Sequence, residues 1–239
     1  SSVERLFRSH RGKVAALIVE PLAGNMGVVP PASGFLQSLR ELCDHHQAVL
    51  IFDEVISGFR VSSGGAQAKF GIRPDLTCLG KIIGGGLPVG AYGGRSEIME
   101  QVAPIGPMYQ AGTLSGNPVA MAAGCKTLQI LQQCNPYPEL ENRANTLALG
   151  LQKVFSETEI PLTINRVGSM MTLFFNPFPV TGWETASASN KTDFTRFFHK
   201  MLEQGIYLPP SPLEAMFVST AHSDSDLQLT IEAAKQALT

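Results

Sequence analysis

The chain has 239 residues, of which 44% are hydrophobic and 16% are charged. A chain of this length and composition buries a substantial core, which excludes a wholly disordered protein. The 18 Lys and Arg residues against 20 Asp and Glu residues give a formal net charge of −2, so the sequence lacks the basic block that nucleic acids and anionic membranes attract.

The first part of the sequence predicts a strand, a helix and a second strand. Residues 14–19 form a short apolar run rich in β-branched residues, which indicates a strand buried on both faces. Residues 48–52 form a second such run, which ends at Asp53. The apolar residues between these runs recur at helical spacing: Phe35, Leu36, Leu39, Leu42 and Cys43. This succession predicts a parallel sheet that is covered by helices.

Shorter apolar runs at 76–79 and 89–93 bring the expected number of strands before residue 134 to about four. Asn117 followed by Pro118 is typical of a helix start. The strongest break in the chain is Asn-Pro-Tyr-Pro at 135–138. We therefore expect residues 1–134 to be the latter part of a larger α/β domain and residues 135–239 to be a small α+β domain. The second half predicts helices over 140–155, 194–204 and 224–238 and a strand over 171–175.

Two charged residues lie where a ligand would meet them. Asp53 follows a buried strand, and ligands of open α/β sheets bind at the carboxyl ends of strands. A cap after the strand explains its position equally well. Lys81 lies inside an apolar run. Two isoleucines follow it, and after them come three consecutive glycines at 84–86. An apolar setting would disfavour the ammonium form and leave a nucleophilic amine, whereas a lone lysine is usually solvated.

Two loops add further candidates. In residues 109–118, small and hydroxyl side chains lead into a helix N-terminus, which suits a phosphate group, although an ordinary helix cap accounts for this pattern equally well. Residues 20–27 form a polar loop after another strand, where Glu20 is equally a structural carboxylate. An amine, a strand-end carboxylate and a phosphate cradle are together what pyridoxal 5'-phosphate requires of a protein.

Longer runs of sequence resemble the class III, fold-type I aminotransferases, which depend on pyridoxal 5'-phosphate. The resemblance rests on Phe-Asp-Glu-Val at 52–55, Gly-Phe-Arg at 58–60, Pro-Asp-Leu at 74–76 and Leu-Gly-Lys-Ile-Ile-Gly-Gly-Gly-Leu-Pro at 79–88. A finer resemblance, to the glutamate-1-semialdehyde 2,1-aminomutases, rests on further segments: 19–21, 24–27, 88–94, 106–118, 205–208, 211, 214–215 and 217–219. It implies part of a large, mostly parallel-sheet domain followed by a small α+β domain.

The resemblance implies a role for particular residues around the cofactor. Lys81 would form the covalent imine with the cofactor and move protons between cofactor and substrate carbons. Asp53 would bind the pyridine nitrogen, and Val55 would pack on the face of the ring. Asn25 would lie near the phenolic oxygen of the cofactor.

The resemblance also implies a homodimer with a shared active site. Gly112 and Thr113 would reach the cofactor phosphate of the neighbouring subunit, and Glu214 would lie near the amino end of the substrate. The implied reaction converts glutamate-1-semialdehyde to 5-aminolevulinate, the precursor of tetrapyrroles such as chlorophyll and haem. The amino group moves within one molecule through the pyridoxal and pyridoxamine 5'-phosphate forms of the cofactor.

Alternative functions stay open at this stage. A class III transaminase with a separate amino donor and acceptor would share Lys81 and Asp53. Family members are much longer and have an additional part before residue 14, so this sequence is also consistent with a non-catalytic dimerisation or interaction module. We favour a piece of a longer polypeptide, or of a nicked enzyme whose other piece stays associated, over a naturally short protein.

The remaining composition indicates the compartment. The four cysteines are scattered, without a CxxC pair, which favours reduced thiols in the cytoplasm, or in the plastid stroma of a photosynthetic eukaryote. The five histidines have no spacing typical of a metal site. No apolar run reaches the roughly 18 residues that a membrane span needs, so we expect a soluble protein.

Overall fold

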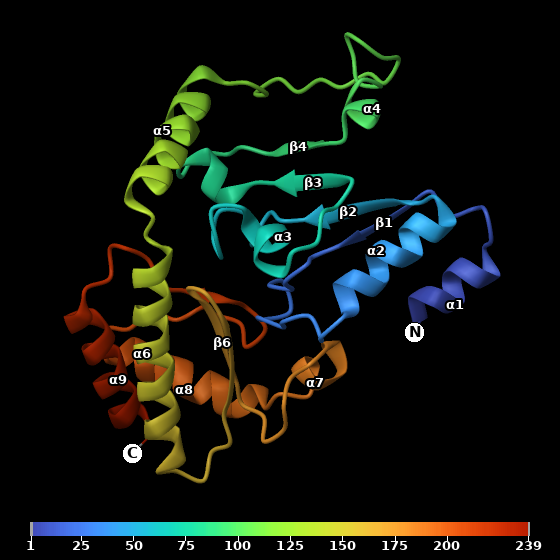
Figure 1. The fold of residues 1–239 in the computed structure, drawn as a ribbon. Helices are drawn as coiled ribbons and strands as arrows, with labels where there is room; N and C mark the ends of the chain where they lie inside the picture. The colour runs from blue at the N-terminus through green and yellow to red at the C-terminus, as the bar shows by residue number, and fades with distance from the viewer. Residues whose placement is uncertain (1, 239) are drawn as a thin grey trace. The chain divides into compact units, whose positions relative to one another are not determined.

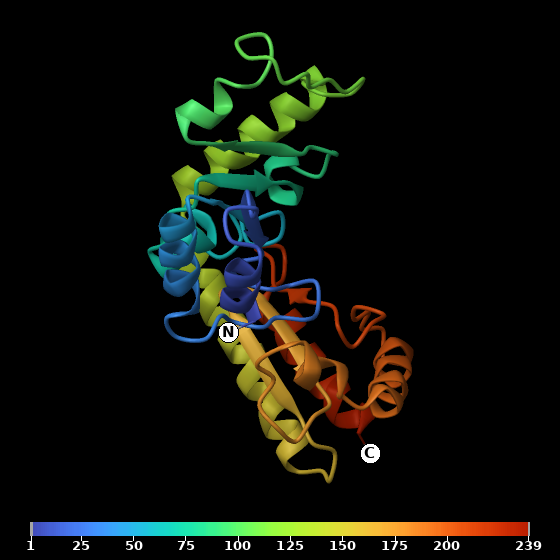
Figure 2. The same ribbon diagram turned by 90° about the vertical axis from the view of Figure 1, so that its right-hand side faces the viewer.

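The computed structural model describes residues 2–238, and these fall into two compact units (Figures 1 and 2). The first unit contains the residues up to 21 together with 32–135, and the second contains 22–31 together with the residues from 136 onward. Residues 22–31 follow the first strand in sequence, yet they pack with the C-terminal half. No local pattern in the sequence predicts that residues 22–31 belong to the second unit.

A four-stranded sheet forms the centre of the first unit, in the order β1 (Ala16–Val19), β2 (Val49–Asp53), β3 (Leu76–Leu79) and β4 (Ala91–Gly94). β1 pairs with β2 and β2 with β3 in parallel, whereas β4 pairs antiparallel to β3 (Figure 1). The prediction of a mostly parallel sheet with helices is confirmed. The helical elements of this unit are α1 (Ser2–Ser9), α2 (Phe35–His46), α3 (Gly65–Phe70), the 3₁₀ helix η1 (Lys81–Gly84), α4 (Ser96–Met99) and α5 (Pro118–Cys134).

Helix α2 covers the sheet with the apolar face that its spacing predicts. Leu36, Leu39 and Cys43 are buried, and they form one core cluster with Leu50 and Phe52 of β2. Burying these side chains contributes roughly 1.5–3 kcal/mol for each large aliphatic or aromatic residue. The packing of α2 therefore fixes β2, the strand that ends at the candidate residue Asp53.

The strand predicted at 14–19 forms as β1, but the prediction that it is buried on both faces is wrong for the part of the chain that the structure describes. Its residues alternate between exposed and half-buried, and the side chain of Ile18 is 62% exposed. Parallel sheets normally bury both faces. The apolar run correctly indicates a strand, but the sequence pattern does not reveal what covers it.

A three-stranded antiparallel sheet and four helices form the second unit in the described residues. The strand order is β5 (Thr163–Val167), β6 (Met170–Phe174) and β7 (Met216–Phe217). The helices are α6 (Tyr137–Ser156), α7 (Trp183–Ser187), α8 (Lys191–Glu203) and α9 (Asp224–Ala237). α6 packs against β5, β6 and α9. None of the helices within residues 2–238 combines the length and the apolar character needed to cross a membrane.

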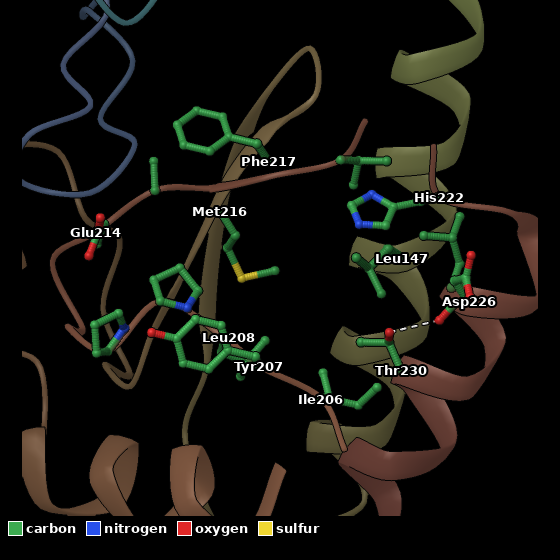
Figure 3. Close-up of a pocket in the computed structure, with 15 residues that line it drawn as sticks. Leu147, Ile206, Tyr207, Leu208, Glu214, Met216, Phe217, His222, Asp226 and Thr230 are labelled. Atoms are coloured by element: carbon green, nitrogen blue, oxygen red, sulfur yellow. Dashed lines mark hydrogen bonds between the residues drawn. The ribbon is translucent and has the colours of Figure 1, made fainter. Parts of the chain in front are cut away.

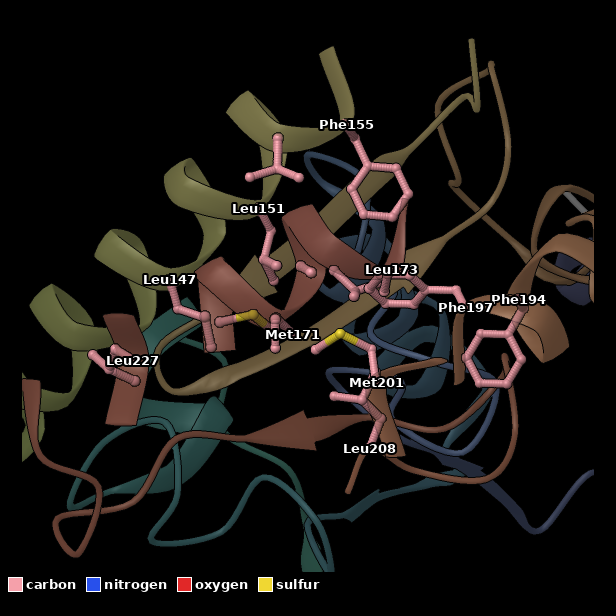
Figure 4. Close-up of a cluster of buried hydrophobic side chains, with 14 of the residues drawn as sticks. Leu147, Leu151, Phe155, Met171, Leu173, Phe194, Phe197, Met201, Leu208 and Leu227 are labelled. Carbon is pink, nitrogen blue, oxygen red and sulfur yellow. The ribbon is translucent and has the colours of Figure 1, made fainter. Parts of the chain in front are cut away.

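The core of the second unit is built around aromatic side chains (Figure 4). The rings of Phe155 and Phe197 meet edge to face with centroids 5.2 Å apart, and Phe175 meets Phe155 in the same way at 5.5 Å. Met171 and Met201 are fully buried beside them. Edge-to-face pairs of this kind add to the stabilisation that area burial alone gives.

Asp75 connects three elements of the first unit. Its carboxylate accepts hydrogen bonds from the amide of Leu50 at 2.7 Å, from Arg40 at 2.9 Å and from Arg95 at 3.1 Å. Burial raises the pKa of Asp75, but the Leu50 amide and the two guanidinium groups outweigh burial and hold that pKa below its usual value. The ionised form therefore stabilises the junction of α2, β2 and the end of β4.

We expect Asp75→Asn to lower the free energy of unfolding at neutral pH by about 1–3 kcal/mol, because two cations and an amide lose their anionic partner. The stabilisation by ionised Asp75 is fully present above the unfolded-state pKa. It is lost as the pH falls through the lower folded-state pKa, so the difference between wild type and variant shrinks in acid. Urea unfolding across this pH range measures both effects. Asp44→Asn is the matched control, because Asp44 also binds Arg40 but its side chain is 65% exposed. An equal loss in both variants would contradict this account.

Candidate active site

The parallel pairing of β2 and β3 brings two candidate residues to one edge of the sheet. Asp53 lies opposite Cys78 in the register of the two strands. The amide of Glu54 then donates to the carbonyl of Cys78 at 2.9 Å, which continues the pairing one residue past β2. Lys81 begins η1 two residues after β3 ends. Asp53 therefore ends one strand and Lys81 follows the neighbouring one, both at the carboxyl ends where open α/β sheets bind ligands.

The Asp53 carboxylate uses one of its oxygens within the chain. Oδ1 accepts a hydrogen bond from the amide of Val55 at 3.0 Å, which closes a tight turn directly after β2. Oδ2 has no hydrogen-bond partner in residues 2–238, and the residue is half-buried. The cap that the sequence allowed is thus formed, and it leaves the second oxygen able to bind a ligand.

Gly80 lets the chain pass close to Val55 immediately before Lys81. A Cβ atom at Gly80 would lie 3.3 Å from Cγ1 of Val55, so a larger residue would crowd that side chain, and 3.5 Å from the carbonyl oxygen of Val89, an ordinary contact. Lys81 itself has a positive φ of 51° and is exposed. The expectation that an apolar setting surrounds the Lys81 amine is therefore not met within residues 2–238.

The glycines after Lys81 pack η1 against α5. Gly85 has a positive φ of 59°, and a Cβ atom there would lie 2.7 Å from the carbonyl oxygen of Ala123 and 2.6 Å from Oγ1 of Thr127. On the facing helix, a Cβ atom at Gly124 would collide with the carbonyl oxygen of Ile83. The close backbone approach predicted from the glycines is present, but its partner is a helix of the same unit.

The segment before α5 forms the ordinary helix cap that the sequence left as an alternative. Oδ1 of Asn117 accepts hydrogen bonds from the amides of Val119 at 3.1 Å and Ala120 at 3.2 Å. Those two amides are therefore engaged by the chain itself. Gly112 and Thr113 precede the cap and are exposed.

Two other predicted residues, Asn25 and Glu214, belong to the second unit, and both are exposed. Thr172 of β6 connects their segments. Its hydroxyl accepts a hydrogen bond from the amide of Val28 at 2.9 Å and donates to the carbonyl of Glu214 at 3.2 Å. No sequence pattern indicated Thr172, because the two residues that its hydroxyl joins, Val28 and Glu214, are far apart in the chain.

A cavity of about 480 Å³ lies within the second unit, and Glu214 is among the residues that line it (Figure 3). Met216 and Phe217 supply part of its apolar lining, while His222 and Asp226 supply polar groups. An apolar hollow with a few polar groups is the usual form of a small-molecule site. The unit thus offers Glu214 at the wall of a ligand-sized space.

Sequence reasoning missed Glu54, although it lies in the motif at 52–55. Its side chain is fully buried, at 0% exposure. A second carboxylate directly after a buried strand was the available signal, since buried acidic residues are rare unless they are bonded.

The chemistry of the first unit suits a cofactor that carries an aldehyde and a basic ring nitrogen. Lys81 offers an exposed amine, and Oδ2 of Asp53 offers a hydrogen-bond acceptor that the described chain leaves unused. Val55, which follows Asp53, presents an apolar side chain beside Gly80. The amine and the strand-end carboxylate match two of the three requirements of pyridoxal 5'-phosphate.

Comparison with known proteins agrees with the resemblance that the sequence motifs indicate. The model of the family described as aminotransferase class-III matches residues 1–238. The chain is 58% identical over 235 residues to the glutamate-1-semialdehyde 2,1-aminomutase of Desulforamulus reducens, covering 98% of this chain and 54% of that protein. It is 57% identical over 237 residues to the enzyme of the same name from Thermomicrobium roseum, covering 99% and 55%. The chain thus spans about half the length of the curated relatives that it matches.

Solved structures also match. An omega-transaminase from Sphaerobacter thermophilus has a TM-score of 0.91 and 32% identity, covering 99% of this chain and 54% of that one. A glutamate-1-semialdehyde-aminomutase from Pseudomonas aeruginosa PAO1 in complex with PMP has a TM-score of 0.88 and 25% identity, with the same coverage. The fold of both units therefore recurs in transaminases and in an aminomutase.

We expect Gly124→Ala to destabilise the first unit, because its Cβ atom would meet a backbone carbonyl that cannot rotate away. The loss should be about 1–3 kcal/mol, despite the better helix propensity of alanine. Gly150→Ala is the matched control in α6, since its Cβ atom would meet only side-chain atoms of Ile231. Chemical unfolding of both variants measures the difference. If Gly124→Ala were as stable as wild type, the close packing of η1 on α5 would be refuted.

Proposed function

Because the chain belongs to the class III aminotransferase family, we propose that it provides the cofactor-binding half of a pyridoxal phosphate-dependent aminomutase. The proposed reaction converts glutamate-1-semialdehyde to 5-aminolevulinate, a precursor of tetrapyrroles such as chlorophyll and haem. The observation that carries the proposal is the placement of Asp53 and Lys81 after neighbouring parallel strands. The names of the relatives that are more than half identical support this particular substrate.

Three residues of the first unit have tasks in this proposal: Lys81, Asp53 and Val55. Pyridoxal 5'-phosphate, when bound, supplies an electron sink for negative charge at a substrate carbon. Lys81 would hold the cofactor aldehyde through Nζ, and the same Nζ, once displaced by the substrate amine, would accept and return the proton of the substrate carbon. Oδ2 of Asp53 accepts a hydrogen bond from the protonated pyridine nitrogen and stabilises its positive charge. Val55 contacts the face of the ring.

The remaining residues of the proposal belong to the second unit and to a second copy of the chain. Asn25 binds the phenolic oxygen of the cofactor, and Glu214 binds the amino end of the substrate. Gly112 and Thr113 bind the cofactor phosphate of the partner subunit in a homodimer. Their exposure before α5 supports this, since a turn that serves another subunit must be free to reach it.

We further propose that residues 1–134 are the latter part of the cofactor-binding domain and residues 135–239 the small domain. The reaction takes place in the cytoplasm, or in the stroma if the source is a photosynthetic eukaryote. Support comes from Cys43, Cys78, Cys125 and Cys134, all of which are free thiols. Free thiols persist in reducing compartments.

A transaminase with a separate amino donor and acceptor is the second candidate function. It is favoured by the omega-transaminase match, which has the higher TM-score of the two structures described above. The two reactions share Lys81 and Asp53, so the residues of the first unit do not separate them. They differ in whether an external amine is consumed.

The test measures 5-aminolevulinate formed from glutamate-1-semialdehyde by the full polypeptide that carries this sequence, with no other amine or keto acid added. We expect turnover that Lys81→Ala abolishes and that Asp53→Asn lowers at least about 100-fold, because the charge on the ring nitrogen loses its partner. Lys126→Ala, at an exposed position of α5, is the matched control. Turnover that requires an external amine would favour the transaminase, and full activity of Lys81→Ala would exclude both reactions at this site.

A further inference from the structure

Glu54 is a fully buried acid whose carboxylate receives hydrogen bonds from four donors. Oε2 accepts from the hydroxyl of Ser57 at 3.0 Å and from the amide of Ala66. Oε1 accepts from the amide and from the side-chain Nε2 of Gln67, both at 3.0 Å. Burying a carboxylate is costly unless its oxygens are bonded. These four hydrogen bonds offset that cost. Through them the buried carboxylate holds the segments that carry its donors in place.

The loop between β2 and α3 closes on this carboxylate. The amide of Gly58 donates to the main-chain carbonyl of Glu54 at 2.8 Å at one end of the loop. At the other end Gly65 has a φ of 69°, and a Cβ atom there would collide with the Glu54 carboxylate. Only glycine fits at that point without strain. Glu54 therefore binds both ends of the loop at once.

The same network reaches strand β3 just before Lys81. Nε2 of Gln67, which binds Glu54, also donates to Oγ1 of Thr77 at 3.2 Å. The amide of Glu54 donates to the carbonyl of Cys78. A Cβ atom at Gly58 would lie 2.6 Å from Cδ2 of Leu79, so the loop packs directly on that side chain. Three successive residues of β3 are thus contacted by groups that Glu54 orders.

We propose that Glu54 is the positioning residue that fixes Asp53 and Lys81 relative to one another. It follows Asp53 directly in sequence, and through Gln67 it holds the strand from which Lys81 emerges. The proposal rests on the proposed function, because the spacing of the two residues matters only if both bind one cofactor. Glu54 acts through these neighbours and does not itself touch the cofactor.

An ionised carboxylate suits this position better than an amide. Two of its four donors are backbone amides, of Ala66 and Gln67, and a backbone N–H cannot reverse its role. In Glu54→Gln, either orientation of the new amide group would set its NH₂ against one of these two backbone N–H groups. One buried donor is then left without an acceptor, so the closest isostere breaks the network.

The experiment compares variants of the full polypeptide by amide hydrogen exchange and by cofactor binding. Glu54→Gln should speed exchange in peptides covering 76–81 by about tenfold, the effect of one unsatisfied buried donor, and leave 36–46 unchanged. Its Kd for pyridoxal 5'-phosphate should rise by a similar factor, and the pH profile of the bound cofactor's absorbance should shift. Glu41→Gln, on the exposed face of α2, is the matched control and should match the wild type.

A second pair of variants tests the connection to β3 without removing the buried acid. Thr77→Val deletes the hydroxyl that Gln67 binds but keeps the shape, whereas Thr77→Ser keeps the hydroxyl. The proposal requires faster exchange at 76–81 and weaker cofactor binding in Thr77→Val, with Thr77→Ser close to the wild type. If Glu54→Gln fails to fold, the two Thr77 variants still test whether the network around Glu54 positions β3.

Two results would overturn the proposal. Glu54→Gln could loosen only the loop at 54–67 while 76–81 exchanges at the wild-type rate, or Thr77→Val could behave as Thr77→Ser does. Failure of the proposed function is recognised separately, because the unsubstituted protein would then bind no pyridoxal 5'-phosphate at Lys81. The exchange comparison still shows in that case whether the Glu54 network orders β3.

Discussion

Parallel pairing of β2 with β3 is the constraint on which the candidate site depends. Because the two strands run in the same direction, the residues that follow them emerge at the same edge of the sheet. Asp53 ends one strand, and Lys81 follows the other. A carboxylate and an amine that are 28 positions apart in the sequence are thereby placed at the same edge of the sheet. An antiparallel arrangement would send them to opposite edges.

Close backbone packing then limits how far this edge can move. The turn after β2 is closed by Oδ1 of Asp53, and the loop beyond it is closed by the buried carboxylate of Glu54. On the other side, η1 lies against α5 at distances that only glycine at 85 and 124 permits. Such contacts are rigid, because neither a carbonyl oxygen nor a backbone amide can rotate away as a side chain can. A site that orients a reacting group benefits from support of this kind.

Local patterns predicted much of this fold, while features that depend on distant residues escaped them. The helix over Phe35–His46 and the cap at Asn117 follow from neighbouring residues, and both are present. The exposure of Ile18, the packing of residues 22–31 with the second unit and the hydroxyl of Thr172 that joins two loops depend on residues far away in the chain. The glycines after Lys81 were recognised as a close approach, but their partner helix could not be read from the sequence.

The most direct test of the central claim is covalent labelling with the cofactor. The protein is incubated with pyridoxal 5'-phosphate, reduced with borohydride and digested, and the modified peptide is identified by mass spectrometry. The account predicts a single stoichiometric adduct at Lys81, because Asp53 and the packed edge of the sheet select that amine. Sub-stoichiometric adducts spread over several lysines, with no preference for Lys81, would contradict it.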